Sequence, residues 1–342
     1  MRPGALGDIL LTLPALDALH EGPKSPFRWR GPCEIEVMGN LAVLSFLPGR
    51  SAVTAVSSFD RADLAALFQP DATPPESLQL YLNSFDLILS YATSPEHPFA
   101  RHLAHTAKGR VLSFDPRPVP GQRMHMCDYL QQPLRELGIA PNAAPPRLML
   151  TAADQQDAVQ WWTEHGLDGQ PAIAIHPGSG SLSKNWPAEG FVAVAHRLAR
   201  ERGVRIVWLS GSADAATVAA VQRTLDDEEA LWLQDPPLSL LAAVLARAVL
   251  YLGNDSGVSH LAAAVGVPSV VIFGPTDPAI WAPRGRDVRI VRGTALCAPC
   301  DSVRRQSCPQ RVCLESVSVD MVMEQAVPRL QRFRQLLRTS VR

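Results

Sequence analysis

Three short loops hold the residues that are best suited to chemistry in this chain. The first, Gly4–Asp8, precedes an apolar segment with helical periodicity and places the carboxylate of Asp8 at the start of that helix. Its glycines permit close approach of another group to the backbone. Asp is also a common N-cap residue, whose side chain accepts hydrogen bonds from the first N–H groups of a helix. The spacing leaves a functional carboxylate and a simple cap both open.

The second loop, His176–Pro187, has the composition of a phosphate cradle. Its small residues are Gly178, Ser179 and Gly180. They expose backbone N–H groups and a hydroxyl. Lys184 adds a positive charge that suits a phosphate. The loop is not a Walker A motif, because Asn185 follows the lysine, and it does not match the dinucleotide fingerprint. A polar surface loop with a solvated lysine is the alternative.

The third loop, Gly253–His260, joins an apolar strand to a helix. Free N–H groups at Ser256 and Gly257 begin the helix, and His260 lies one turn along it, near the end that carries Asp255. Such a helix start attracts anions. The alternative is a capped helix with a structural histidine. Two helix starts of this kind in one half of the chain favour a phosphate ligand more than either would alone.

The elements around the second and third loops alternate between strands and helices. We expect strands at Ala172–Ile175, Val204–Leu209, Ala230–Leu233, Val249–Leu252 and Ser269–Phe273, and helices at Ala188–Arg202, Ala215–Leu225, Ser239–Ala246 and Ser256–Val265. This alternation predicts a parallel sheet covered by helices on both faces. In such sheets, ligands bind beyond the carboxyl ends of the strands, where these loops would lie.

The first half alternates less regularly. We expect a helix at Ile9–Leu19 and strands at Glu34–Met38, Ala52–Val56 and Phe85–Ser90. The proline-rich segment Ala140–Pro146 is the best linker candidate, because prolines exclude a helix there. We therefore expect an α/β protein with an N-terminal domain at 1–150, a C-terminal domain at 151–320, and a final helix at 321–342 that packs back across the domains.

Composition excludes several classes of protein. Lys and Arg number 32 against 33 Asp and Glu, so the chain has no overall field to recruit nucleic acid. No apolar run approaches the roughly 18–20 residues of a membrane span, and Asp8 interrupts any signal-peptide pattern. We expect a cytoplasmic protein.

Four of the six cysteines lie close together in the sequence near its end: Cys297, Cys300, Cys308 and Cys313.

Taken together, the loops resemble those of glycosyltransferase family 9, the heptosyltransferases of lipopolysaccharide core assembly. The resemblance covers nearly the whole chain and rests on blocks in a fixed order: Ala5–Asp8, Leu13–Leu16, His176–Gly178, Lys184–Pro187, Asn254–Ala264, Gly266–Pro268 and Phe273–Pro278. These blocks are specific for the family and uninformative about the particular sugar.

The resemblance implies a GT-B fold, with two facing doubly wound Rossmann-like domains, and inversion at the anomeric carbon without a metal. It implies that Asp8 is the general base that deprotonates the acceptor hydroxyl. It also implies a donor site in the second domain, with ADP-heptose as the expected donor and a lipopolysaccharide core or related glycolipid as the acceptor. The implied donor-binding residues are His176, Gly178, Ser179, Gly180, Lys184, Asp255, Ser256, Gly257 and His260. The nucleoside would lie near Ser210–Ser212 and Pro236–Leu238.

The sequence itself bears on metal and cofactor binding. An Asp-x-Asp pair is the usual way to hold Mg²⁺ against a diphosphate, and the sequence contains none. The positive charge that neutralises a diphosphate must therefore come from Lys184 and the helix starts. We expect no cofactor. The four clustered cysteines are a candidate Zn²⁺ site, although their spacing is irregular, and buried or paired thiols are the alternative.

Two other enzyme or binding classes remain open at this stage. A nucleotide-sugar epimerase shares the architecture and needs no second substrate. A non-catalytic relative would bind a nucleotide sugar without transferring it. In addition, the basic tail suggests peripheral association with the inner membrane; its arginines are Arg329, Arg332, Arg334, Arg338 and Arg342.

One departure from the family concerns the segment before the first loop. An apolar strand normally precedes the Gly-Asp loop, whereas only Met1, Arg2 and Pro3 stand there in this chain. We therefore expect a first strand of at most three residues, a thin or open centre in the first sheet, and a start that is internal to the natural gene.

Overall fold

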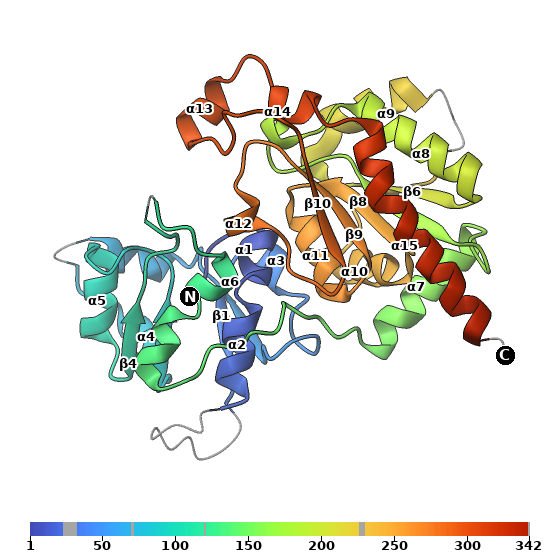
Figure 1. Cartoon of the computed structure of the whole chain (residues 1–342). Helices are drawn as coiled ribbons and strands as arrows, with labels where there is room; N and C mark the ends of the chain where they lie inside the picture. Colours follow the sequence, from blue (N-terminus) through green and yellow to red (C-terminus); the bar gives the residue numbers. More distant parts are fainter. Residues whose placement is uncertain (23–32, 70–71, 120, 226–229, 341–342) are drawn as a thin grey trace. The chain divides into compact units, whose positions relative to one another are not determined.

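The computed structural model of the chain describes residues 1–22, 33–69, 72–119, 121–225 and 230–340 (Figure 1). The chain divides into two compact units, Met1–Ala144 and Pro145–Arg342. The boundary lies inside the predicted linker and six residues before the predicted split at 150. Leu148 already belongs to the second unit, because its backbone N–H donates to the carbonyl of Ala264.

The second unit is built on one six-stranded parallel sheet. Its strands are β5 (Ala172–His176), β6 (Arg205–Ser210), β7 (Trp232–Gln234), β8 (Leu250–Asn254), β9 (Ser269–Phe273) and β10 (Val288–Arg292). They lie in the order β10-β9-β8-β5-β6-β7, and all neighbours are parallel. The order reverses between β5 and β8, so this unit is doubly wound, as the alternation of strands and helices predicts.

Helices cover both faces of this sheet (Figure 1). They are α7 (Ala152–Glu164), α8 (Ala188–Arg202), α9 (Ala215–Leu225), α10 (Leu238–Arg247), α11 (Gly257–Val265), α12 (Pro278–Trp281), α13 (Ser302–Ser307), α14 (Val312–Glu315) and α15 (Val319–Ser340), with short 3-10 turns η3 (Leu182–Lys184) and η4 (Ser212–Asp214). Helices α8, α9 and α15 share one apolar core with alternate strand residues such as Ile173 and Ile175. Helix α10 packs between α7 and α11.

The first unit contains two separate pairs of parallel strands. Strand β1 (Glu36–Gly39) pairs with β2 (Ala55–Ser58), and β3 (Leu87–Ser90) pairs with β4 (Arg110–Ser113). Its helices are α1 (Leu6–Leu10), α2 (Leu13–His20), α3 (Leu41–Leu44), α4 (Glu76–Leu82), α5 (Pro98–Thr106) and α6 (Met126–Tyr129), with 3-10 segments η1 (Ala62–Phe68) and η2 (Gln132–Leu137).

In the described part of the first unit, Met1 and Arg2 stand between the two strand pairs. The N–H of Arg2 donates to the carbonyl of Met38 in β1 at 2.9 Å, and the N–H of Tyr91 donates to the carbonyl of Met1 at 2.9 Å. Before Glu36, the described residues contain no assigned strand. The expectation of a very short first strand and an open centre is therefore confirmed.

Several predicted elements need correction. The single helix expected at Ile9–Leu19 is two helices, α1 and α2, because Pro14 lacks an N–H and takes a position in the first turn of a new helix. The edge strand β10 was not predicted, because its apolar residues alternate with Arg289 and Arg292 and present a weak pattern. The short strand β4 was missed for a similar reason.

The final helix, α15, contacts α8, β8, β9 and β10 of its own unit. Its return across the domains stays a prediction. Arg329 is buried, and its guanidinium donates to the carboxylate of Asp287 at 2.9 and 3.1 Å, so this arginine belongs to the fold and is unavailable to a membrane. The side chains of Arg332, Arg334, Arg338 and Arg342 lie outside the described part of the structure. Among the described residues, no helix has the length and apolar character that crossing a bilayer requires.

Candidate donor site and carboxylate site

The second and third loops meet at the reversal point of the six-stranded sheet. Strands β5 and β8 are neighbours, with His176 level with Gly253 at their carboxyl ends. The wholly buried side chain of Asn254 joins the loops, because its amide nitrogen donates to the carbonyl of Pro177 at 2.7 Å and its oxygen accepts from the N–H of Trp186 at 3.0 Å. The structure thus brings these two sets of predicted residues together.

His176 occupies a buried polar network at this point. Its Nε2 lies 2.9 Å from Oδ2 of Asp214, and its Nδ1 lies 3.4 Å from the hydroxyl of Ser256. Asp214 also accepts from the N–H of Gly211 at 2.9 Å. Burial alone would raise the pKa of Asp214, but the hydrogen bond and charge of His176, together with the Gly211 N–H, outweigh it and lower that pKa. Asp214 is therefore held as a carboxylate.

Gly178 must be glycine because of this carboxylate. A Cβ at position 178 would collide with Oδ1 of Asp214. Gly180, by contrast, has open space where a Cβ would be, so its backbone is accessible on that side. The two glycines predicted for the phosphate loop thus have different local reasons to be small.

Lys184 and Asp255 form an ion pair. Nζ of Lys184 lies 3.0 Å from Oδ2 of Asp255, and the same oxygen accepts from the hydroxyl of Thr276 at 2.6 Å. The Asp255 side chain is 6% exposed and that of Lys184 is 24% exposed, so the carboxylate is buried and the ammonium reaches toward the surface. Asp255 therefore anchors Lys184 at the start of α11.

Helix α11 begins at this ion pair. Ser256 is its N-cap and accepts from the N–H of Ser259, while Gly257 is the first helical residue and is partly exposed. His260 is buried one turn along the helix. The first N–H groups of the helix and the Lys184 ammonium thus lie around one short stretch of chain, which is a favourable environment for an anion.

Hydrogen bonds within the second loop fix the shape of its remaining residues. The hydroxyl of Ser179 contacts Oδ1 of Asn185 at 2.6 Å and the carbonyl of Ser181 at 2.7 Å, and Asn185 donates to the hydroxyl of Thr217 at 2.8 Å. Ser179 is buried. Its side chain holds the shape of the loop, and its predicted part in donor binding stays a prediction.

The two segments expected near a nucleoside are connected by Asp235. Its carboxylate accepts from the N–H of Ser212 at 3.2 Å, and its own N–H donates to the carbonyl of Ser210 at 2.8 Å. Asp235 adopts a positive φ of 44°, which is uncommon for a residue with a side chain. The ends of β6 and β7 are therefore held together by Asp235.

Asp8 lies in the first unit, at the third position of α1. Its Oδ2 accepts from the N–H of Ala5 at 3.2 Å, and its Oδ1 accepts from the guanidinium of Arg2 at 3.2 Å. Ala5, not Asp8, is the N-cap, so the simple N-cap alternative is wrong, although Asp8 does support the helix start. Arg2 is 4% exposed while Asp8 is 32% exposed, so a buried cation holds an accessible carboxylate in place.

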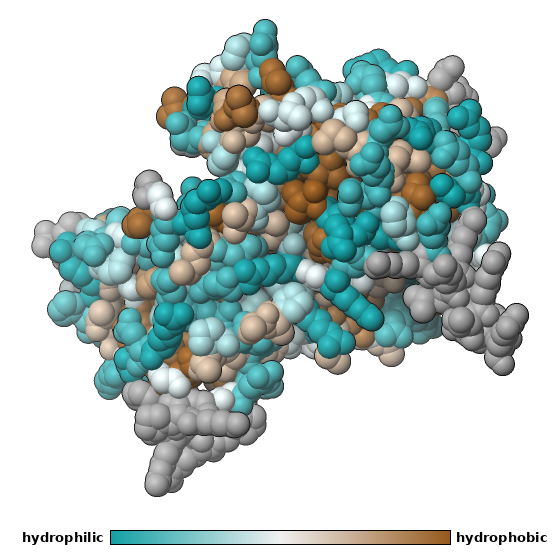
Figure 2. Space-filling view, in the orientation of Figure 1, coloured by the Kyte–Doolittle hydropathy of each residue, from teal (hydrophilic) through white to brown (hydrophobic). Residues whose placement is uncertain are grey.

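The clustered cysteines occupy a lobe at α13 and α14. Cys297 is exposed, Cys313 is buried, and no disulfide joins them or their neighbours among the described residues. The described residues contain no group of three or more His, Cys, Asp or Glu placed to hold a metal ion, so the candidate Zn²⁺ site gains no support. Apolar side chains protrude from this lobe (Figure 2), with Leu296 and Val303 both highly exposed.

Four residues of these sites escaped the sequence analysis as functional candidates: Arg2, Asp214, Asn254 and Thr276. Asp214 carries a local signal, because it stands three residues after Gly211, the spacing of an N-cap and a supporting acidic residue. Thr276 lies within a block that the family resemblance included. Their partners, however, are distant in the chain, and spacing alone gives no indication of such contacts.

We expect Asp214→Asn to destabilise the second unit by about 1–3 kcal/mol at pH 7, since it removes a charged hydrogen-bond acceptor. The folded-state pKa of Asp214 lies below its unfolded value, so its stabilisation is present above pH ~4 and is lost as pH falls through the folded pKa. Denaturant unfolding of parent and variant from pH 7 to pH 2 should therefore show a difference that is constant above pH ~4 and converges below it. A difference that stays constant over this range would mean that the charge is unimportant.

A sequence model of glycosyltransferase family 9 (heptosyltransferase) matches residues 88–309. Lipopolysaccharide heptosyltransferase 1 of Pseudomonas aeruginosa is 35% identical over 150 residues, which cover 40% of this chain and 41% of that protein. The chain thus spans about 41% of the length of this curated relative.

Solved structures match over nearly the whole chain. A family 9 glycosyltransferase from Veillonella parvula has a TM-score of 0.76 at 19% identity and covers 96% of this chain and 95% of its own. The Escherichia coli ADP-heptose lipopolysaccharide heptosyltransferase II has a TM-score of 0.69 at 17% identity, covering 97% and 98%. These similarities confirm the predicted GT-B fold. Because the family match extends over more than half of the sequence, the chain belongs to glycosyltransferase family 9, the heptosyltransferases.

Proposed function

We propose that the chain is an inverting, metal-independent glycosyltransferase that moves a sugar from a nucleotide-diphosphate donor to a lipopolysaccharide core or related cell-surface glycan. The expected donor is ADP-heptose, which appears in the name of the E. coli relative. The expected acceptor is a glycolipid, in keeping with the name of the P. aeruginosa relative. The observation that carries the proposal is the Lys184–Asp255 ion pair at the start of α11.

The donor diphosphate is proposed to bind at this helix start. Leaving-group departure from a sugar carbon leaves negative charge on the diphosphate, which needs a fixed positive environment. Lys184 is held by a buried carboxylate and keeps three N–H donors, of which the ion pair uses part. The partly exposed N–H groups near Gly257 add the positive end of the helix dipole. Together they supply the charge that a metal supplies in other transferases.

Asp8 is proposed to be the general base. It is the accessible carboxylate of the first loop, and Arg2 and the N–H of Ala5 orient its two oxygens. A base in this role takes the proton of the acceptor hydroxyl as that oxygen attacks the anomeric carbon from the face opposite the diphosphate. Inversion follows from this single displacement.

Two alternatives predict different products. An epimerase converts the nucleotide sugar without an acceptor, and a non-catalytic relative binds the donor and turns nothing over. Incubation of the protein with ADP-heptose, with and without a lipid A–inner core acceptor, distinguishes the three. Release of ADP that requires the acceptor and yields an inverted glycoside supports the proposal. Acceptor-independent epimer supports the first alternative, and donor binding without turnover supports the second.

We expect Asp8→Asn to retain donor affinity and to lower turnover by roughly 10²–10⁴, the usual effect of losing a general base. Asparagine can still accept from the N–H of Ala5, so the helix start has a substitute contact. Donor affinity by calorimetry, melting temperature and turnover are measured on one preparation. A variant that loses stability yet keeps its turnover would show that Asp8 serves only the helix.

We expect Lys184→Ala to weaken ADP binding by roughly 10–100-fold, because hydrogen bonds to charged groups contribute about 1.5–3 kcal/mol. Adenosine binding should change little, since it has no phosphate. Ser181→Ala is the matched control, because it alters the same loop without removing a charge. Equal losses of ADP and adenosine affinity in Lys184→Ala would instead indicate general damage to the loop.

The association with a membrane surface and the cytoplasmic location both stay predictions. We propose that the basic end of α15 contributes, each arginine near an anionic surface adding about 1 kcal/mol. Replacing Arg332, Arg334 and Arg338 together by glutamine should then reduce co-sedimentation with anionic vesicles at low salt, whereas Arg289→Gln should not. Co-sedimentation that is insensitive to salt and to anionic lipid would contradict this role.

A further inference from the structure

The cysteine lobe is the stretch 294–316 that follows β10 and carries α13 and α14 (Figure 1). Its two ends meet, because the N–H of Thr294 donates to the hydroxyl of Ser316 at 3.0 Å. The wholly buried side chain of Leu314 lies against Gly274 at the end of β9, where a Cβ would collide with it. The lobe is therefore fixed to the six-stranded sheet at its base.

One arginine of this lobe reaches the second loop. Nη1 of Arg311 donates to the carbonyl of Leu182 at 2.5 Å. Leu182 begins η3, the turn that ends with Lys184, and its carbonyl also accepts from the N–H of Asn185 at 3.2 Å. The carbonyl of Arg311 accepts from the N–H of Leu314 at 2.8 Å, which fixes the arginine backbone at the base of the lobe. Its guanidinium therefore holds the carbonyl around which the Lys184 turn closes.

The start of η3 has little apolar packing of its own. None of the three residues of η3 is buried, and the side chain of Leu182 is 61% exposed. The far end of the turn is held by Asn185, whose amide donates to the hydroxyl of Thr217 at 2.8 Å. Polar contacts therefore determine where this turn lies, and the contact at its start comes from Arg311.

A second contact joins the lobe to the other partner of the ion pair. The N–H of Cys300 donates to the carbonyl of Pro275 at 2.7 Å. The next residue, Thr276, donates its hydroxyl to the same oxygen of Asp255 that pairs with Lys184. The lobe thus contacts one chain segment on each side of the Lys184–Asp255 ion pair.

We propose that Arg311 is a positioning residue for the donor diphosphate, because it fixes η3 so that the ammonium of Lys184 stays at the start of α11. The inference rests on the proposed role of Lys184 in binding that diphosphate. A turn that is ordered before the ligand arrives loses less conformational entropy on binding, so the ligand binds more tightly. Arg311 is exposed and acts in this way through the backbone of the loop.

Direct binding of the diphosphate by Arg311 is the competing role. A guanidinium has five N–H donors, and the carbonyl of Leu182 does not occupy them all. The two roles differ in how the effect of Arg311 depends on Lys184. A positioning residue has no effect on ADP binding once Lys184 is removed, whereas a direct ligand still adds its own contribution.

The test compares three substitutions in the full chain. Arg311→Met keeps an apolar, unbranched side chain and removes every N–H donor. Arg304→Met is the matched control, because it removes the same charge from an exposed arginine on α13 of the same lobe. Arg311→Lys keeps the charge and an ammonium that donates to a carbonyl, so it should restore part of what Arg311→Met loses.

The first measurement is amide hydrogen exchange by NMR in the ligand-free protein. We expect Arg311→Met to speed exchange at Lys184 and Asn185 by roughly 3–10-fold, because the turn opens more often. Arg304→Met should leave both rates unchanged. Unchanged exchange in Arg311→Met, or an equal change in Arg304→Met, would overturn the proposal. No donor is present, so this result does not depend on the function proposed above.

The second measurement is ligand affinity by calorimetry. We expect Arg311→Met to weaken ADP binding by roughly 3–10-fold, the effect of one ordinary hydrogen bond, and to leave adenosine binding unchanged. In the Lys184→Ala background, the same substitution should have no further effect on ADP affinity. An additive loss in the double variant would show direct binding of phosphate by Arg311 and would overturn the proposal.

Failure of the proposed function gives a different pattern. If Lys184→Ala leaves ADP affinity unchanged, the diphosphate binds elsewhere, and the positioning role is overturned together with that function. If Lys184→Ala weakens ADP binding while Arg311→Met does not, the donor site stands and the positioning role alone is overturned.

Discussion

The buried amide of Asn254 is the interaction on which the rest of the second unit's site depends. It stands at the end of β8 with no exposed surface and bonds both to the carbonyl of Pro177 and to the N–H of Trp186. These groups flank the loop that carries Lys184. The indole nitrogen of Trp186 in turn donates to the carbonyl of Val317, just before α15. Asn254 thereby joins the end of β8 to the loop that carries Lys184, and Trp186 joins that loop to the segment before α15.

Two buried carboxylates, Asp214 and Asp255, organise the charges of this site, and their partners differ in exposure. Asp214 is turned inward and pairs with His176, which stabilises the junction of β5 with η4. Asp255 is also buried, but its partner Lys184 reaches toward the surface. Leaving a buried carboxylate without a partner is costly, so His176 and Lys184 are each held where their carboxylate requires them. Fold stability and the proposed ligand chemistry therefore depend on two separate contacts, that of His176 with Asp214 and that of Lys184 with Asp255.

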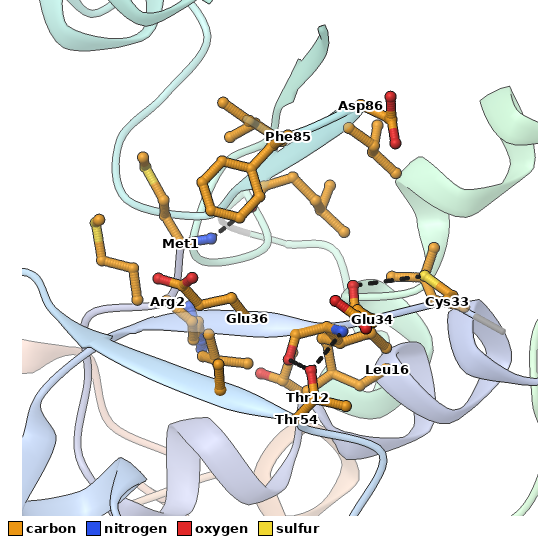
Figure 3. A pocket seen from close by; sticks show the side chains of 18 of the residues that line it. Met1, Arg2, Thr12, Leu16, Cys33, Glu34, Glu36, Thr54, Phe85 and Asp86 are labelled. Atoms are coloured by element: carbon orange, nitrogen blue, oxygen red, sulfur yellow. Dashed lines mark hydrogen bonds between the residues drawn. The ribbon is translucent and has the colours of Figure 1, made fainter. Parts of the chain in front are cut away.

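Much of the second unit could be predicted from sequence, because its strands are apolar runs separated by strongly amphipathic helices. Helices α8 and α9 were predicted with the boundaries that the structure has. The contacts of Lys184 with Asp255 and of His176 with Asp214 could not be predicted from the sequence. Each contact joins residues that are far apart in the chain and that meet only when the strands pair. In the described part of the first unit, each strand is four residues long, and Met1 and Arg2 lie between the two strand pairs (Figure 3). A periodic pattern of that length carries too little information to fix an element's limits.

The contact between Gly178 and Asp214 has a consequence for how this site can vary. Any side chain at position 178 would occupy the space of the carboxylate. A homologue that replaces the glycine is therefore expected to have a smaller or retracted residue where Asp214 stands, and then to lack the histidine's partner as well. Substitutions at positions 176, 178 and 214 should therefore be correlated among relatives, so that the loop after β5, its histidine and the turn after β6 change together.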